Sequence, residues 1–240
     1  MKQALFDEIF RGNNNFPQDE SLWPEHWITP QYKIYEHSLS FPYDISYADI
    51  FKNTSSVYTL LEKRHSLSLQ KDKETHAITR NTIHALCYAA CGVKENNGRS
   101  YGSAGALYPI EVYFFNAIES DDFTRGLYHF SQVTHELTLI KKDNESTLRE
   151  VLGTEQSVVD TLSGVFIYTY TPARNGDKYG WFGARSAFLE VGAIGQNIDI
   201  LAQSIGHATR YIGFTGNKIT DSYLEIDGYN ELSIIAQGIA

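Results

Sequence analysis

The chain has 240 residues, 42% of them hydrophobic and 20% charged, which suits one globular domain with its own core. The formal net charge of −9 argues against a nucleic-acid partner, because a phosphate backbone is bound by an excess of cations. No apolar run approaches the roughly 20 residues of a membrane span, and the first residues lack the apolar core of a secretory signal. We therefore expect a cytoplasmic protein with no membrane partner.

The first 50 residues are rich in aromatic residues and prolines and show no sustained hydrophobic period. This pattern predicts an extended arm over residues 1–50, which packs on a larger unit or forms part of a partner interface. The main domain is then expected over residues 51–240.

Helical patterns follow at residues 56–63 and 79–91. Cys87 and Cys91 lie four apart in the second pattern, so we expect them to share a helix face as small core residues and not to form a disulfide framework. The eight histidines are scattered without HExxH or paired CxxC spacing, and a metal site is therefore not expected.

A turn-rich stretch, 92–105, precedes the alternating run IEVYFFN at 110–116, which reads as a strand. The runs 126–130 and 136–140 predict a hairpin, because five residues with turn character join them.

The next pattern, 146–162, predicts a helix, and the apolar run 164–170 predicts a buried strand. A long helix is then expected over 185–205, where apolar residues recur every three or four positions. Further apolar residues on its other sides, Leu189 among them, predict burial nearly all round, as in a domain or dimer core. The order of these elements indicates a mixed layout of helices and strands.

The small-residue stretch GSAGA, from Gly102 to Ala106, is the first candidate binding element. It is not a Rossmann phosphate loop, because it precedes a strand and Pro109 ends any helix after Leu107. Its backbone can approach a flat ligand closely since no large side chain intervenes. A purely structural turn is the alternative.

Arg64, His65 and Ser66 lie just past a helical pattern. A guanidinium and a hydroxyl together suit a phosphate group, which accepts charge-assisted and directed hydrogen bonds. A charged helix end exposed to water is the alternative.

Lys178 and Tyr179 lie in the glycine-punctuated stretch RNGDKYGWFGAR, which reads as a loop after a strand. A lysine desolvated by aromatic neighbours can act as a base near neutral pH, and an adjacent tyrosine can share the proton or bind substrate. A solvated loop lysine is the alternative.

Taken together, these motifs resemble the SagB-type dehydrogenases of the nitroreductase superfamily, over about residues 56–238. The resemblance rests chiefly on SAGALYPIEVY, with the other matching positions at Arg64, Ser66, Arg99, the run GLYHF, Lys178, Tyr179, Arg185, Glu190, Gly192, Gln196, Asn197, Gly213 and Asp227. It implies a nitroreductase-like α+β fold, with a central, mostly antiparallel sheet surrounded by helices and a long buried core helix.

The resemblance also implies FMN as cofactor and assigns positions around it. Arg64 and Ser66, with His65 between them, would hold the phosphate, and Lys178 and Tyr179 would form the catalytic pair. The backbone of the small-residue turn would line the flavin, at Ser103, Ala104, Gly105 and Leu107. Two further residues, Arg185 and Gly213, would lie near the cofactor.

Two departures from the family pattern concern the cofactor. The proline expected before Ser103 is Gly102, and the chain ends at Ala240 without the basic residue that some nitroreductases use on the phosphate. Both predict a lower affinity for FMN. The short arm also speaks against a separate peptide-clamp domain.

The implied reaction is the oxidation of a peptide thiazoline or oxazoline ring, made beforehand by cyclodehydratase subunits, to a thiazole or oxazole. In this hypothesis the α-proton goes to Lys178 or Tyr179, hydride goes to FMN, and oxygen reoxidises the flavin. The implied partners are a modified precursor peptide, cyclodehydratase subunits and a second copy of the chain. Two other functions stay open: an NAD(P)H-dependent reductase of nitro, quinone or unsaturated peptide substrates, and a non-catalytic scaffold.

Overall fold

The computed structural model describes residues 33, 39–42, 44, 46, 56–67, 75–143, 148–213 and 218–240. Most of the predicted arm, residues 1–50, lies outside these ranges. Within the described part of the arm, β1 (Leu39–Phe41) pairs with β4 and adds a strand at the sheet edge, which the sequence pattern did not predict.

The core of the domain is a seven-stranded sheet in which every neighbouring pair is antiparallel. The expected α+β architecture with a mostly antiparallel sheet is therefore confirmed. Its spatial order is β1, β4 (Leu137–Lys142), β3 (Gly126–Phe130), β2 (Ile110–Asn116), β5 (Gly164–Tyr170), β7 (Leu232–Ile239) and β6 (Thr209–Ile212).

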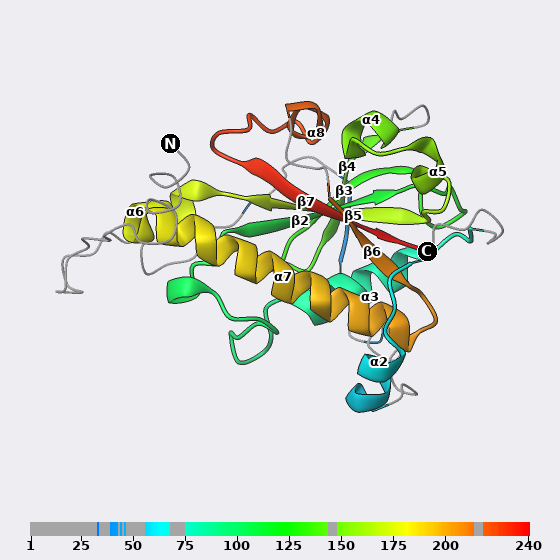
Figure 1. The fold of residues 1–240 in the computed structure, drawn as a ribbon, viewed down its shortest axis with the longest axis horizontal. Coiled ribbons are helices and arrows are strands. Elements are labelled where there is room, and N and C mark those ends of the chain that lie inside the picture. The colour runs from blue at the N-terminus through cyan, green and yellow to red at the C-terminus, as the bar shows by residue number, and fades with distance from the viewer. Residues whose placement is uncertain are drawn as a thin grey trace.

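Helices cover both faces of this sheet, as Figure 1 shows, with α3 (Arg80–Cys91) and α7 (Trp181–Ser204) on one face and α4 (Leu148–Leu152), α5 (Gln156–Val159) and α8 (Lys218–Tyr223) on the other. All seven residues of β2 and of β5 are buried, because helices cover both faces of the sheet. The prediction of a buried strand at 164–170 is confirmed. The alternating run at 110–116 is a strand as predicted, but it is buried on both faces.

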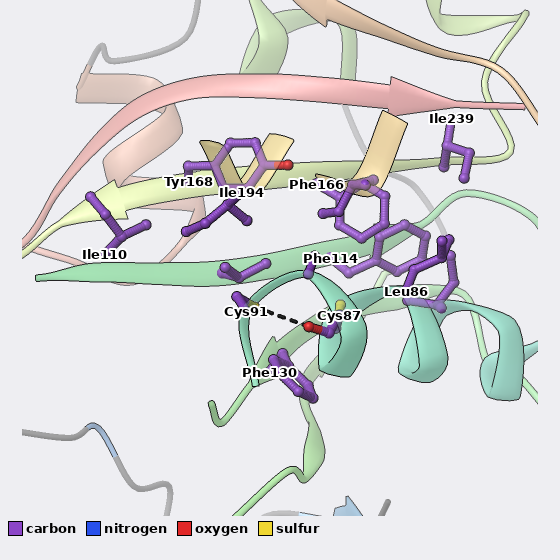
Figure 2. Packing of buried hydrophobic residues seen from close by; sticks show 14 of the residues in the cluster. Leu86, Cys87, Cys91, Ile110, Phe114, Phe130, Phe166, Tyr168, Ile194 and Ile239 are labelled. Carbon is purple, nitrogen blue, oxygen red and sulfur yellow. Dashed lines mark hydrogen bonds between the residues drawn. The ribbon is translucent and has the colours of Figure 1, made fainter. Parts of the chain in front are cut away.

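The main hydrophobic cluster lies between the sheet and the helix pair α3–α7, where Phe114, Phe166 and Ile194 meet (Figure 2). Cys87 and Cys91 are free thiols within this cluster, and the Cys91 thiol donates to the Cys87 carbonyl at 3.1 Å. Burial raises the pKa of Cys91 to about 12, so the thiol stays protonated. The prediction that both cysteines are core residues is confirmed.

Two helix predictions are corrected. Residues 146–162 do not form one helix, because Gly153 adopts a left-handed conformation (φ 57°) and separates α4 from α5. The long helix begins at Trp181 and not at Arg185. It is also not buried all round, since Phe188 and Leu189 are 60% and 72% exposed.

No helix among the described residues combines the length and apolar character that a bilayer span requires. The short helix α2 (Val57–Lys63) agrees with the pattern at 56–63. Its N-cap is Ser56, whose hydroxyl accepts a hydrogen bond from the Thr59 backbone.

Candidate functional site

The predicted binding turn is a single 3₁₀ turn, Ala104–Ala106, held in an uncommon backbone conformation. Gly105, Ala106 and Tyr108 all have positive φ angles, of 64°, 55° and 47°. A left-handed conformation at a non-glycine residue costs about 1–3 kcal/mol and persists only where surrounding contacts impose it. Contacts with neighbouring residues therefore hold the turn from Ser103 to Tyr108, called the 103–108 turn below, in this conformation.

One of these neighbours is Glu190 on α7. The Ser103 hydroxyl donates to Glu190 Oε1 at 2.8 Å and accepts from the Tyr108 backbone N–H at 2.9 Å. Glu190 is 1% exposed. Burial raises its pKa to about 7, although hydrogen bonds from Ser103 and the Ala104 backbone and the charge of Arg99 oppose the rise.

The predicted catalytic pair lies beside the same turn. Lys178 and Tyr179 belong to the one-turn helix α6 (Gly176–Tyr179) and not to a loop, and Lys178 is buried, with 6% exposure, which rules out a solvated lysine. A Cβ atom placed on Gly105 would come within 2.5 Å of the Tyr179 hydroxyl oxygen. Partial burial raises the pKa of Tyr179, which keeps its phenol protonated at neutral pH.

The residues predicted to bind phosphate, Arg64, His65 and Ser66, lie elsewhere, in the segment 64–67. Arg64 follows α2 directly, and its guanidinium lies 3.5 Å from the Asp199 carboxylate near the far end of α7. His65 and Ser66 are exposed, and the Leu67 N–H donates to the Thr209 carbonyl of β6 at 2.8 Å. This segment therefore runs beside the start of β6, and Gly213 follows the end of that strand.

The structure thus divides the predicted cofactor residues into two groups. The 103–108 turn contacts α7 at Glu190, whereas the segment 64–67 contacts it at Asp199. Nine residues make about two and a half helical turns, or roughly 13 Å, so these two positions point to opposite sides of α7. Within one chain the two groups do not come together.

On the N-terminal side of Glu190, α7 presents the exposed side chains of Phe188 and Leu189. Arg185 lies at the same end of the helix, with its guanidinium 4.7 Å from the Phe182 ring centre. It also lines a cavity of about 690 Å³ between α7 and β7, whose other walls are mainly apolar.

The residues present fit a flavin mononucleotide. Arg64 and the exposed Ser66 offer the cationic and hydroxyl donors that a phosphate accepts. At the other group, the exposed Gly102 leaves the backbone open to a flat ring, because a Cβ atom there would meet nothing within 4 Å. Among the described ranges, no three His, Cys, Asp or Glu side chains lie close enough to hold a metal ion.

Several residues that build the site were not predicted from sequence. Glu190 received no role, although it holds the turn, and Asp199 and Arg174 were not singled out. Arg210 on β6 is an exposed cation beside the segment 64–67, where its guanidinium donates to the Leu67 carbonyl at 3.4 Å. The place of Arg210 beside this segment is seen only in the structure, where β6 bonds to Leu67.

Comparisons with known proteins agree with this fold. The family model described as the nitroreductase family matches residues 62–239. The chain is 27% identical over 146 residues to MJ1384 of Methanocaldococcus jannaschii, a nitroreductase by name, which covers 60% of this chain and 73% of that protein.

A second relative is the microcin B17-processing protein McbC of Escherichia coli, 30% identical over 144 residues, or 58% of this chain. The match spans about half of McbC, 53% of its length. Among solved structures, a chain of the E. coli microcin synthetase McbBCD complex with truncated pro-MccB17 shares the fold. Its TM-score is 0.62 at 21% identity, over 82% of this chain and 81% of that one. Because the family model covers well over half of its length, this chain belongs to the nitroreductase family, and the expected nitroreductase-like fold is confirmed.

Proposed function

We propose that this chain is an FMN-dependent dehydrogenase that oxidises peptide thiazolines and oxazolines to thiazoles and oxazoles during the maturation of a ribosomally made peptide. The observation that carries the proposal is the close approach of Tyr179 to Gly105, which puts the buried Lys178 and the half-buried Tyr179 beside the turn expected to line a flavin. The identity of 30% to McbC, a microcin-processing protein, supports the choice of substrate class.

The cofactor assignment rests on the family and on the donor set. Nitroreductase family members bind flavin. In this chain Arg64 and Ser66 would hold the FMN phosphate, the backbone from Ser103 to Leu107 would line the ring, and Arg185 and Gly213 would lie nearby. When bound, FMN supplies the hydride acceptor for the oxidation.

The protein's own residues handle the proton. Tyr179 keeps its phenol proton at neutral pH, since partial burial raises its pKa, and it therefore suits a hydrogen-bond donor to the substrate. Lys178 is the proposed base for the α-proton, because it is buried beside Tyr179, with its Nζ 5.3 Å from the Tyr179 ring centre. Together the two side chains would orient the ring and remove one proton as aromatisation proceeds.

The division of the cofactor residues across α7 supports a homodimer. If a second copy packs on the face that bears Phe188 and Leu189, the 103–108 turn of one copy can meet the segment 64–67 of the other. Exposed apolar side chains of this kind are typical of a protein interface. The fold shared with a chain of the McbBCD complex supports further partners, namely the cyclodehydratase subunits and the modified precursor peptide.

The test is a visible spectrum after FMN reconstitution, followed by turnover of an azoline-containing peptide. We expect flavin absorption bands, and we expect Lys178→Ala and Tyr179→Phe to keep FMN but reduce turnover by roughly 100-fold or more. The exposed residue Lys142 provides a control for the lysine, because Lys142→Ala removes the same group at the end of the sheet far from the 103–108 turn. Normal turnover by both pair variants with bound FMN would refute the catalytic assignment.

A reductase acting on nitro, quinone or unsaturated peptide substrates is the second candidate, and the similarity to MJ1384 favours it. Rapid bleaching of the flavin by NAD(P)H in the absence of peptide would decide for this function. A protein that stays colourless after reconstitution, yet stabilises a cyclodehydratase complex, would decide for the scaffold.

A further inference from the structure

Arg174 links the two elements that meet in the candidate site. It closes the short 3₁₀ helix η5 (Pro172–Arg174), directly before α6, and is only 6% exposed. One guanidinium nitrogen, Nη1, donates to the Tyr108 carbonyl at 3.1 Å, and the other, Nη2, donates to the Glu111 carboxylate. A single side chain is thus bonded to the end of the 103–108 turn while its own backbone leads into the helix that carries Lys178.

The anchor on the sheet is fixed independently. Glu111 lies on β2, is 4% exposed and also contacts His129 of β3, with 2.7 Å between Glu111 Oε2 and His129 Nε2. Burial alone would raise the pKa of Glu111, but the charge of Arg174 and the hydrogen bonds from His129 and Arg174 lower it to about 2. The carboxylate therefore stays ionised, and Arg174 keeps a charged partner.

The turn side of this link is strained. Tyr108 has a φ of 47°, its N–H is held by Ser103, and the Arg99 guanidinium lies 3.5 Å from its ring centre. The hydrogen bond from Arg174 to the Tyr108 carbonyl adds a third restraint on this residue. Contacts from several directions are what a left-handed non-glycine residue requires.

The helix side is fixed by the next residue, Asn175, which is 1% exposed. Its side-chain oxygen accepts from the Tyr170 hydroxyl at 2.8 Å, and its amide donates to the Gly183 carbonyl at 3.1 Å. Arg174 and Asn175 therefore attach α6 to the sheet, to the turn and to the first turn of α7.

We propose that Arg174 is a positioning residue, which sets the distance and orientation of the Lys178–Tyr179 pair relative to the 103–108 turn. This proposal rests on the proposed function, because the turn is taken as the flavin-facing wall and the pair as the catalytic groups. Stability alone is a weak reason for such a pair, since buried ion pairs are often replaceable by apolar residues without loss. Two directed bonds from one planar group, in contrast, fix a geometry.

The test compares Arg174→Lys with Arg125→Lys. Lysine keeps the charge next to Glu111 but cannot reproduce the fork that reaches Tyr108 and Glu111 together. Arg125 is the control, because its guanidinium also donates to two partners, here the backbone carbonyls of Ala117 and Asp143, from a half-buried position. Both variants are made in the full chain, reconstituted with FMN and examined by amide hydrogen exchange and by azoline turnover.

For Arg174→Lys we expect faster exchange, by about tenfold or more, in two segments together, 103–108 and 175–180, relative to the wild type and to Arg125→Lys. Turnover per bound flavin should fall by about 10–100-fold with KM changed by less than about threefold, since a displacement near 1 Å at the reacting groups costs rates of this order. Exchange that is unchanged in these segments, or raised evenly over the whole sheet, would overturn the proposal.

Failure of the proposal and failure of the proposed function give different results. If the wild type binds FMN but oxidises no azoline, the function is wrong, and the exchange experiment still decides whether Arg174 couples the two segments. If the wild type oxidises azolines and Arg174→Lys turns over normally, the positioning role is wrong and the function stands. Should Arg174→Lys not fold, Glu111→Gln removes the charged anchor instead and should give the same pattern of exchange; its absence would overturn the proposal.

Discussion

Ser103 and Glu190, 87 residues apart in sequence, are joined by a hydrogen bond of 2.8 Å between the serine hydroxyl and the glutamate Oε1. This bond ties the turn expected to line the flavin to the long helix α7. Because burial raises the pKa of Glu190 to about 7, this carboxyl makes the stability of the fold depend on pH.

The first prediction concerns Glu190→Gln. A carboxyl whose folded pKa lies near 7 holds a proton between about pH 4.5 and 7, where the unfolded chain has released it. The wild type should therefore lose stability as pH rises through this window, with the full cost reached above pH 7. Glutamine keeps the oxygen that accepts from Ser103 and cannot ionise. The variant should therefore not show this loss of stability as pH rises.

Urea unfolding at pH 5 and pH 8 measures the effect. The free energy of unfolding of Glu190→Gln, relative to the wild type, should rise by about 2 kcal/mol between the two pH values. Glu150→Gln, a change on the exposed side of α4, serves as the control and should follow the wild type at both pH values. Parallel pH dependences for wild type and Glu190→Gln would contradict the prediction.

The second prediction compares two glycines of the predicted binding turn. Gly105→Ala should cost about 1 kcal/mol or more of stability, because its φ is 64° and the new Cβ would lie 2.5 Å from the Tyr179 hydroxyl oxygen. Gly102→Ala should be neutral or slightly stabilising, since a Cβ there meets nothing within 4 Å. The space beside Gly102 thus admits a Cβ atom.

Thermal unfolding and azoline turnover of the two alanine variants check this comparison. Gly105→Ala should also lower turnover by displacing Tyr179, while Gly102→Ala should leave it within about twofold of the wild type. Equal effects of the two substitutions would show that the Gly105–Tyr179 contact contributes neither to stability nor to turnover.

Much of the sheet could be predicted from sequence, since an apolar run between turn residues, such as that of β5, is typical of a strand covered on both faces. The alternating pattern of β2 also indicates a strand. The break at Gly153 was also readable, because a glycine after a helical pattern commonly ends the helix. The edge strands β1 and β6 are only three and four residues long, too short to show a period.

The candidate site was harder to predict from sequence than the sheet. RNGDKYGWFGAR reads as a loop because of its glycines, yet it contains α6 and the start of α7, which are held by the buried Asn175. Periodicity showed that α7 is apolar on several sides, but only the packing reveals that Phe188 and Leu189 stay exposed. The partnership of Ser103 with Glu190 depends on tertiary structure that no local pattern records.

The third prediction concerns the phosphate-binding segment. Arg64→Ala should weaken FMN binding by about 10–100-fold, because a charge-assisted hydrogen bond contributes roughly 1.5–3 kcal/mol. Arg210→Ala should weaken it less, by several-fold, since Arg210 lies beside the segment as a second exposed cation. Arg149→Ala, on the exposed side of α4, is the control.

Titration of flavin fluorescence at two salt concentrations provides the measurement. Loss of a phosphate contact should make the affinity of Arg64→Ala less sensitive to salt than that of the wild type, because screening then has one fewer charge pair to weaken. Unchanged affinity in Arg64→Ala would remove the segment 64–67 from the cofactor site.

The last prediction concerns the exposed face of α7. If two copies complete the cofactor site, Phe188→Asp should both dissociate the dimer and weaken FMN binding, since a charge at the centre of an apolar interface is desolvated without a partner. Ile219→Asp is the matched control, because Ile219 is 55% exposed on α8, across the sheet from α7. Sedimentation of the FMN-loaded proteins should give a dimer for the wild type and for Ile219→Asp, and a flavin-poor monomer for Phe188→Asp. A wild-type monomer with full FMN occupancy would show that one chain supplies both groups of residues, despite their positions on opposite sides of α7.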